Sequence, residues 1–234
     1  MTKQSPPDKR AASAGDGSIK PRQRRSQAER REESRRRAVD AAIHCLAEEG
    51  YAATTMIHVA ELAKISRGGL LHHFPGKPEL LEAVARESIR RLTAKRKAAL
   101  GNAKEGVDRF IALTDAAWAN IREPESIAIM EIMIGSRSDP QITDLSRTLA
   151  KLDRFQAVKA KKLARRAGIT SDKLIDTMNR LHQAAMRGLV LEWVITGNED
   201  QAEEAFELLS WYKQQITERM LEESRDFPAI DGRE

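Results

Sequence analysis

The sequence predicts an all-α protein. Charged residues make up 32% of its 234 residues and hydrophobic residues 41%, with many good helix formers and only 13 glycines and 8 prolines. Apolar residues recur three and four positions apart, as they do on one face of a helix, and strand-like alternation is absent. The sequence also lacks a repeat of about 20–50 residues, which would indicate a solenoid.

The N-terminal third predicts a tail followed by three helices. Residues 1–25 have too little apolar content to offset the entropy of ordering, so we expect a disordered basic tail. A domain over 26–76 follows, with helices expected at 27–49, 54–63 and 67–74. The boundary signals are Gly50 as a C-cap, Thr54 or Thr55 as an N-cap, the interruption Lys64-Ile65-Ser66, and the stop Pro75-Gly76.

A second helical domain is expected over residues 77–226. A fourth helix starts at about Lys77, with Pro78 in its first turn, and ends near Leu100. Pro124 and Pro140 open later helices, Gly168 closes one, and Gly197-Asn198 forms a turn. The expected helices after the fourth span 105–121, 124–136, 140–167, 171–196 and 200–224.

The charge distribution indicates a polyanionic partner. Residues 1–91 carry 18 Lys and Arg against 12 Asp and Glu, whereas residues 92–234 carry 22 against 23. The basic excess therefore lies entirely in the N-terminal third, which favours nucleic acid or an anionic membrane surface. The alternative is a basic tail that only keeps the protein soluble.

The location is expected to be the cytoplasm, without membrane association. No apolar run approaches the roughly 20 residues that a membrane span needs, and the N-terminus has no apolar signal segment. The single cysteine, Cys45, excludes an internal disulfide and fits a reducing compartment.

The stretch from Val59 to Leu81 places a short, glycine-containing helix between two good ones. Helix, short turn and second helix form the helix-turn-helix arrangement. Ala60 permits close approach of the helices, Ile65 fills the turn, and Leu70 and Phe74 return to the core. The outward residues of the third helix combine glycines with Arg and His, which suits a helix that enters the major groove of DNA.

Residues 54–81, TTMIHVAELAKISRGGLLHHFPGKPELL, resemble the DNA-binding signature of TetR-family transcriptional regulators. The resemblance covers about residues 30–90, and the remaining residues agree only in layout. It implies an N-terminal three-helix helix-turn-helix domain followed by a helical domain for effector binding and dimerisation. Two departures stand out: Lys64 occupies a position that is usually glycine, and Leu71 and His73 occupy positions that are usually tyrosine.

The family pattern implies the DNA contacts. It assigns Thr55, His73 and Lys77 to phosphates. The residues expected at base edges are Ser66, Arg67, Gly68, Gly69, Leu71 and His72.

The basic residues before the first helix form a possible minor-groove arm. Arg24 and Arg25 are the residues expected to enter that groove, and a solvated charge run is the alternative. For the pair His72-His73, the alternatives are a surface pair without a partner or a chance metal site. Adjacent helical positions point about 100° apart and chelate poorly, so no metal site is expected. Cys45 lies on the apolar side of its helix and is expected to be a buried small hydrophobe.

The last two helices predict a dimer interface, because both carry near-heptad apolar seams and the family dimerises through a four-helix bundle. The residues expected there are Leu181, Ala185, Gly188, Trp193, Leu209, Tyr212 and Ile216. The alternative is that these helices only fill the core of their own monomer.

The effector pocket is predicted from bulky, adaptable side chains. Methionines suit apolar binding sites, although a Met at helical spacing also serves as ordinary core. The residues expected to line the pocket are Trp118, Met130, Met133, Met178, His182 and Met186. Glu131 and Arg137 are expected either to anchor a polar ligand group or to form a surface pair.

The function implied is a DNA-binding transcriptional regulator, a repressor that binds a pseudo-palindromic operator as a homodimer. A small apolar or amphipathic ligand would release it. The alternative is a ligand-independent global or architectural DNA-binding protein. An enzyme is not expected, because the chain has no Gly-rich phosphate loop, metal-ligand cluster or nucleophile–base spacing, and no cofactor is predicted.

Overall fold

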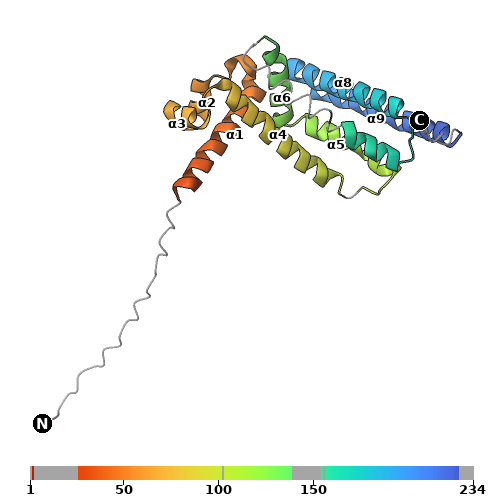
Figure 1. Ribbon diagram of the computed structural model, residues 1–234, viewed down its shortest axis with the longest axis horizontal. Helices are drawn as coiled ribbons and strands as arrows, with labels where there is room; N and C mark the ends of the chain where they lie inside the picture. Colours follow the sequence, from red (N-terminus) through yellow and green to blue (C-terminus); the bar gives the residue numbers. More distant parts are fainter. Residues whose placement is uncertain (1, 3–25, 102, 139–153, 155–156, 227–234) are drawn as a thin grey trace, which may run out of the picture.

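The computed structural model describes residues 2, 26–101, 103–138, 154 and 157–226, and throughout this part of the chain the fold is all-α, as predicted. Figure 1 shows the helix-turn-helix region at one end and the long pair α8 and α9 at the other, with α4 running between them. The expected tail 1–25 and most of the expected start of helix 140–167 lie outside the described residues. Residues 157–166 are helical.

The first three helices agree with the expected boundaries. They are α1 (Gln27–Ala53), α2 (Met56–Leu62) and α3 (Arg67–His73). A capping box between Ser26 and Glu29 starts α1, and the backbone of Gly50 leaves helical geometry at φ 85°. Gly50 thus ends the regular part of the helix, and one short helical stretch follows it.

The next helices connect the two ends of the molecule. They are α4 (Lys77–Ala99), α5 (Val107–Ile121) and α6 (Pro124–Gly135), followed by the short 3₁₀ helix η1 (Ser136–Ser138). Proline stands in the first turn of both α4 and α6, where its missing N–H costs no hydrogen bond.

The last two helices form an antiparallel hairpin. They are α8 (Asp172–Thr196) and α9 (Glu199–Asp226), which lie side by side in Figure 1. Gly197 ends α8 in the left-handed conformation, with φ 71°, as the Gly197-Asn198 turn requires.

The core around the helix-turn-helix extends beyond residue 76. It includes Leu80, Leu81 and Val84 of α4, and also Ala128 and Ile132 of α6. Two smaller cores lie between α5 and the α8–α9 hairpin, one around Phe110 and the other around Trp118. Helices α4 and α6 therefore belong to the packing of the N-terminal region as well as to that of the C-terminal region.

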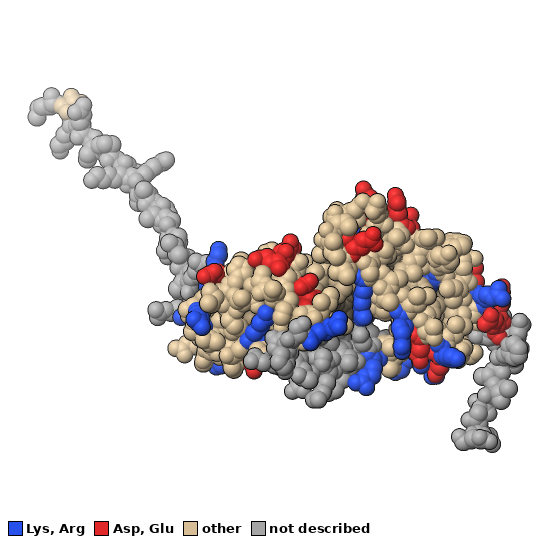
Figure 2. All heavy atoms as spheres, turned by 90° about the horizontal axis from the view of Figure 1, so that it is seen from above, with Lys and Arg blue, Asp and Glu red and all other residues tan. Residues whose placement is uncertain are grey.

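An ion-pair network joins helices α1, α4 and α6. The guanidinium of Arg91 on α4 contacts Asp40 of α1, Glu87 at 2.7 Å and Glu125 of α6 at 3.5 Å. The hydrogen bond from Arg90 has the largest effect on the pKa of Glu87. Together with the hydrogen bond from Arg91, it lowers this pKa to about 2. On the face shown in Figure 2, acidic and basic side chains are interspersed over both halves of the molecule.

None of the described helices has both the length and the apolar content that crossing a bilayer requires.

Candidate nucleic-acid interface and effector pocket

The turn between α2 and α3 has a left-handed residue at its centre. Lys64 has φ 53° and is the one non-glycine residue with positive φ in the described part of the chain. Glycine adopts this conformation without steric cost, which explains why the resembling family places glycine there. Ile65 fills the turn from the core side, as expected.

Helix α3 presents its polar face outward. Leu70 is fully buried and Phe74 is 2% exposed, and together they hold the helix on the core. Ser66 caps the helix by accepting from the Gly69 amide at 3.0 Å. The outward residues are Ser66, Arg67, Gly68, Leu71 and His72, whereas Gly69 is half-buried. The structure therefore brings the residues expected at base edges onto one short helix.

His73 lies behind this face. Its Nε2 is 2.6 Å from the Ser34 hydroxyl of α1. Burial lowers the pKa of His73, and the positive charges of nearby Arg31 and Arg35 act in the same direction. A neutral imidazole hydrogen-bonded to Ser34 can offer a phosphate only its other ring nitrogen.

Thr55 and Lys77 occupy different surroundings. The exposed Thr55 caps α2 by accepting from the His58 amide at 3.2 Å. Lys77 does not point freely outward, in contrast with the expected phosphate contact. Its Nζ donates to the Tyr51 carbonyl at 2.9 Å and lies 3.9 Å from the centre of the Tyr51 ring. The lysine joins α4 to the end of α1, and a phosphate would compete with both contacts.

The expected minor-groove residues Arg24 and Arg25 lie outside the described residues. At the start of α1, Arg30, Arg31 and Arg35 are exposed. Arg35 also lies over the Phe74 ring, 5.3 Å from its centre. The beginning of α1 therefore presents basic side chains on the side that carries α3.

Cys45 is fully buried, as expected, but it has titratable neighbours that the sequence did not reveal. Its Sγ and ligand atoms of Glu49 and His58 all lie within 4.8 Å of one another, a spacing that could hold a metal ion. Burial raises the pKa of the Cys45 thiol, and Thr54 donates a hydrogen bond to its sulfur at 3.4 Å. A neutral, buried thiol fits the structural role better than a reactive one.

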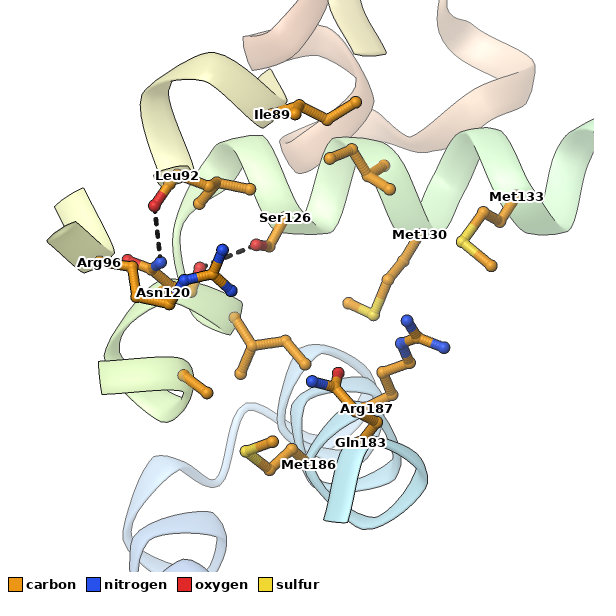
Figure 3. A pocket seen from close by; sticks show the side chains of 13 residues that line it. Ile89, Leu92, Arg96, Asn120, Ser126, Met130, Met133, Gln183, Met186 and Arg187 are labelled. Carbon is orange, nitrogen blue, oxygen red and sulfur yellow. Dashed lines mark hydrogen bonds between the residues drawn. The ribbon is translucent and has the colours of Figure 1, made fainter. Parts of the chain in front are cut away.

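A pocket, here called the outer pocket, opens between α4, α5, α6 and α8 with a volume of about 120 Å³. Figure 3 shows Met130 and Met133 reaching it from α6, and Met186 from α8. The structure thus places three of the predicted lining residues around one space. Its full lining is Ile89, Leu92, Arg96, Ala117, Asn120, Ile121, Ser126, Ile129, Met130, Met133, Gln183, Met186 and Arg187.

A second space, here called the inner cavity, has about 110 Å³ and contains the predicted residues Met178 and His182. It shares Arg96, Ala117, Gln183 and Met186 with the outer pocket. Its lining is Arg96, Leu100, Phe110, Leu113, Thr114, Ala117, Lys159, Ala160, Leu163, Ile175, Met178, Asn179, His182, Gln183, Met186 and Lys213.

Trp118, which was expected in the pocket, is not among the residues that line these two spaces. Its ring stacks on Phe206 at 4.5 Å, and its indole N–H donates to Glu203 at 2.9 Å. The physical reason is helical phase: Ala117 faces the cavities, and the next position turns toward α9. Glu131 is also used elsewhere, because its carboxylate accepts from the Tyr51 amide at 2.8 Å.

Lys213 also lines the inner cavity, although the sequence did not lead us to expect it there. It is 4% exposed, and it occupies a core position in the series Phe206, Leu209, Lys213, Ile216 and Met220 of α9. A lysine at an apolar position of an amphipathic helix was the signal that could have revealed it.

The predicted dimer residues fall on two faces of the α8–α9 hairpin. Leu181 and Tyr212 are more than half exposed, and nothing lies within 4 Å of a Cβ built on Gly188. Ala185 is half-buried. Trp193, Leu209 and Ile216 are half-buried and pack against their own monomer's cores. The exposed apolar side chains of the two helices are Leu181, Leu191, Val194, Ile195, Leu208, Trp211 and Tyr212.

Comparison with known proteins identifies the family of this fold. Residues 38–84 match the model of the family described as bacterial regulatory proteins, tetR family. This stretch of the chain is a TetR-family domain. This stretch contains α2, α3 and the start of α4, so the outward residues of α3 belong to the TetR-family helix-turn-helix.

Relatives with curated names are similar over about half of the chain. The chain is 30% identical over 132 residues to the HTH-type transcriptional regulator CymR of Pseudomonas putida, covering 56% of this chain and 65% of CymR. It is also 30% identical over 124 residues to SrpR of the same species, covering 53% of this chain and 56% of SrpR. The matches span less than two thirds of either relative. Both are regulators by name, in agreement with the expectation that the chain is not an enzyme.

A solved structure supports the fold over most of the chain. A TetR transcriptional regulator from Chloroflexus aurantiacus superposes with a TM-score of 0.66 and 23% identity, covering 80% of this chain and 96% of that one. Over the superposed part the two proteins share the same helical architecture, while their sequences differ.

Proposed function

We propose that the chain is a DNA-binding transcriptional regulator of the cytoplasm, a repressor that acts as a homodimer on a pseudo-palindromic operator. Support comes from α3, whose exposed face combines Arg67, Gly68 and His72 on a helix held firmly by Leu70 and Phe74. Two such helices in a dimer reach successive major-groove faces when half-sites lie about 34–36 Å apart. The exposed apolar face of α8 and α9 supports the homodimer.

We further propose that a small apolar or amphipathic ligand releases the operator. One observation carries this proposal: the helices that line the outer pocket also build the DNA-binding core. Helix α4 lines the pocket with Ile89 and Leu92, and α6 lines it with Met130. The same two helices place Leu81 and Ile132 in the core around α3.

A ligand in the pocket can therefore act on the DNA-binding domain through α4 and α6. It changes operator affinity only if it binds one arrangement of these helices better than another. The alternative is a ligand-independent architectural protein, whose DNA binding no compound would change.

DNA recognition is tested with the DNA that flanks the protein's own gene. We expect protection of a two-fold symmetric site and a steep decrease of affinity with salt, because phosphate contacts release counterions. Replacement Arg67→Ala should cost on the order of 1–3 kcal/mol at one base position per half-site. The control Arg166→Ala removes an exposed arginine outside α3 and should leave specificity unchanged. Equal weakening of specific and random DNA by Arg67→Ala would contradict the base-reading role.

The ligand switch is tested by screening compounds for operator release. Met130→Ala and Met186→Ala should reduce the response to an active compound, while operator affinity stays within a few-fold. Trp118→Phe is the matched control, because Trp118 lies outside both cavities and its stacking on Phe206 survives the change. If no compound releases the operator, the architectural alternative is favoured.

A further inference from the structure

The inner cavity combines apolar walls with basic groups and no acid. Among the described residues that line it, none is Asp or Glu, while Arg96, Lys159, His182 and Lys213 all reach it. Lys213 is 4% exposed and His182 is 6% exposed. Buried cations in proteins are normally paired, because the loss of hydration is costly. Lys213 therefore needs an explanation, because it is nearly fully buried and none of these lining residues is an acid.

Lys213 is held by neutral partners. Its Nζ donates to the carbonyl oxygens of Phe110 at 2.6 Å and Ile111 at 3.3 Å, both on α5. An ammonium group has three donors, so one N–H remains after these two bonds. Burial lowers the pKa of Lys213 to about 7, and the exposed carboxylate of Asp115 opposes that effect only in part.

His182 has a vacant hydrogen-bonding position. Its Nδ1 lies 3.0 Å from the Met178 carbonyl, which can only accept, so Nδ1 carries a proton. Its Nε2 is buried and makes no hydrogen bond of good geometry in the described part of the chain, although the backbone of Leu209 on α9 lies near enough to favour the protonated ring. Buried polar atoms without partners are rare, and each one calls for an explanation such as an absent ligand.

We propose that the inner cavity binds a small amphipathic acid, with its carboxylate received by Lys213 and His182. The apolar body would lie among Phe110, Leu113 and Ile175 and reach the outer pocket past Met186. The carboxylate would accept the remaining N–H of Lys213 and place a negative charge beside it. This inference rests on the proposed function, since it names the chemical class of the effector.

Binding of an anion should be linked to proton uptake. The charged or titratable groups around Lys213 are Arg96 of α4, Asp115 of α5, Lys159 of residues 157–166 and His182 of α8. Burial lowers the pKa of His182, and the charge of Lys213 acts in the same direction. A bound carboxylate favours the protonated forms of both groups and so raises both pKa values. Acid affinity should therefore be greatest below the free pKa of Lys213, about 7, and should fall as the pH rises above it.

The experiment compares each acid with its neutral amide. Hexanoic, octanoic, decanoic and benzoic acids, and their primary amides, are titrated into the full-length protein by calorimetry at pH 6 and pH 9. At least one acid should bind about tenfold or more tightly than its amide at pH 6, the increment expected for a charge-assisted hydrogen bond. The preference should decrease at pH 9.

Variants assign the effect to Lys213. Lys213→Met should abolish the preference for acids, whereas Lys173→Met, an exposed lysine of α8, should retain it. If Lys213→Met does not fold, the pH dependence of the wild-type protein decides. Equal binding of acids and amides at pH 6, no binding of any acid, or an unchanged acid preference in Lys213→Met would overturn the inference.

Operator binding separates this inference from the proposed function. An acid that binds through Lys213 without changing operator affinity would uphold the anion site and contradict the effector role. Conversely, operator release by amides and not by acids would uphold the effector role and contradict the anion site.

Discussion

The ring of Tyr51 lies against Gly135, so that a Cβ added at Gly135 would overlap the ring. The backbone amide of Tyr51 donates to the Glu131 carboxylate, and its carbonyl oxygen accepts from Lys77. Gly50 makes this possible, because its φ of 85° turns the end of α1 toward α6. Tyr51 thereby connects the DNA-binding region, through α1 and α4, to the end of a helix that lines the outer pocket.

Gly135→Ala should therefore disturb the contact between α1 and α6. The new methyl group forces the Tyr51 ring out of its position, and overpacking of this kind typically costs about 1–3 kcal/mol. Urea unfolding measures the loss. The double variant Tyr51→Ala/Gly135→Ala serves as the control, since without the ring the methyl group has nothing to displace. Purely additive losses in this double-mutant cycle would show that the two residues are not coupled.

Lys64→Gly should stabilise the protein. The left-handed conformation of a non-glycine residue costs on the order of 1 kcal/mol or more, which glycine avoids, although glycine also gains entropy in the unfolded chain. The net gain should be a few tenths to about 1 kcal/mol in the free energy of unfolding. Lys64→Ala removes the charge but keeps the Cβ, so it should bring no comparable gain. A gain of equal size from Lys64→Ala would trace the effect to charge instead.

Gly68→Ala should separate folding from DNA binding. A Cβ on Gly68 meets nothing within 4 Å in the free protein, and alanine favours helix by about 0.5–1 kcal/mol over glycine. Thermal stability should therefore be retained or rise slightly. Operator affinity should fall, because the methyl group would stand between α3 and the DNA. Unchanged affinity in a gel-shift titration would mean that this face of α3 does not approach the duplex closely.

The stability of the wild-type protein should rise with pH between about 7 and 10.5, the folded and ordinary pKa values of Lys213. In this window the unfolded chain binds the lysine proton and the folded chain does not, so raising the pH favours folding, by at most about 1.4 kcal/mol per unit. Below pH 7 both states are protonated and this slope vanishes.

The measurement compares urea unfolding of the wild type and of Lys213→Met across the same pH range. Lys213→Met lacks the group, so its advantage over the wild type should be largest near pH 7 and should shrink toward pH 10. A constant difference between the two proteins would contradict the lowered pKa.

The sequence by itself determined the helices and the position of the helix-turn-helix. Local signals sufficed for this, because Thr55, Ser66 and Gly197 act through their own backbone and the apolar residues follow the helical period. The left-handed turn at Lys64 could also be expected, since it depends on the local path of the chain.

The tertiary structure alone decided how α8 and α9 use their two apolar faces. Periodicity marks a residue as apolar but does not state which neighbour it meets, so Trp193, Leu209 and Ile216 were placed at a partner although they pack on their own monomer's cores. Trp118 was assigned to the pocket for the same reason, although it is one helical position from Ala117, which does line it.

The contacts that connect distant segments were likewise invisible in the sequence. Tyr51 and Gly135 are 84 positions apart, and Lys213 meets the Phe110 carbonyl across 103 positions. Nothing in the local sequence around either residue encodes its partner, because such contacts arise only when α1 packs on α6 and α9 packs on α5. Packing of helices therefore decided what surrounds each side chain, whereas the local sequence already indicated, to within a few residues, where the described helices begin and end.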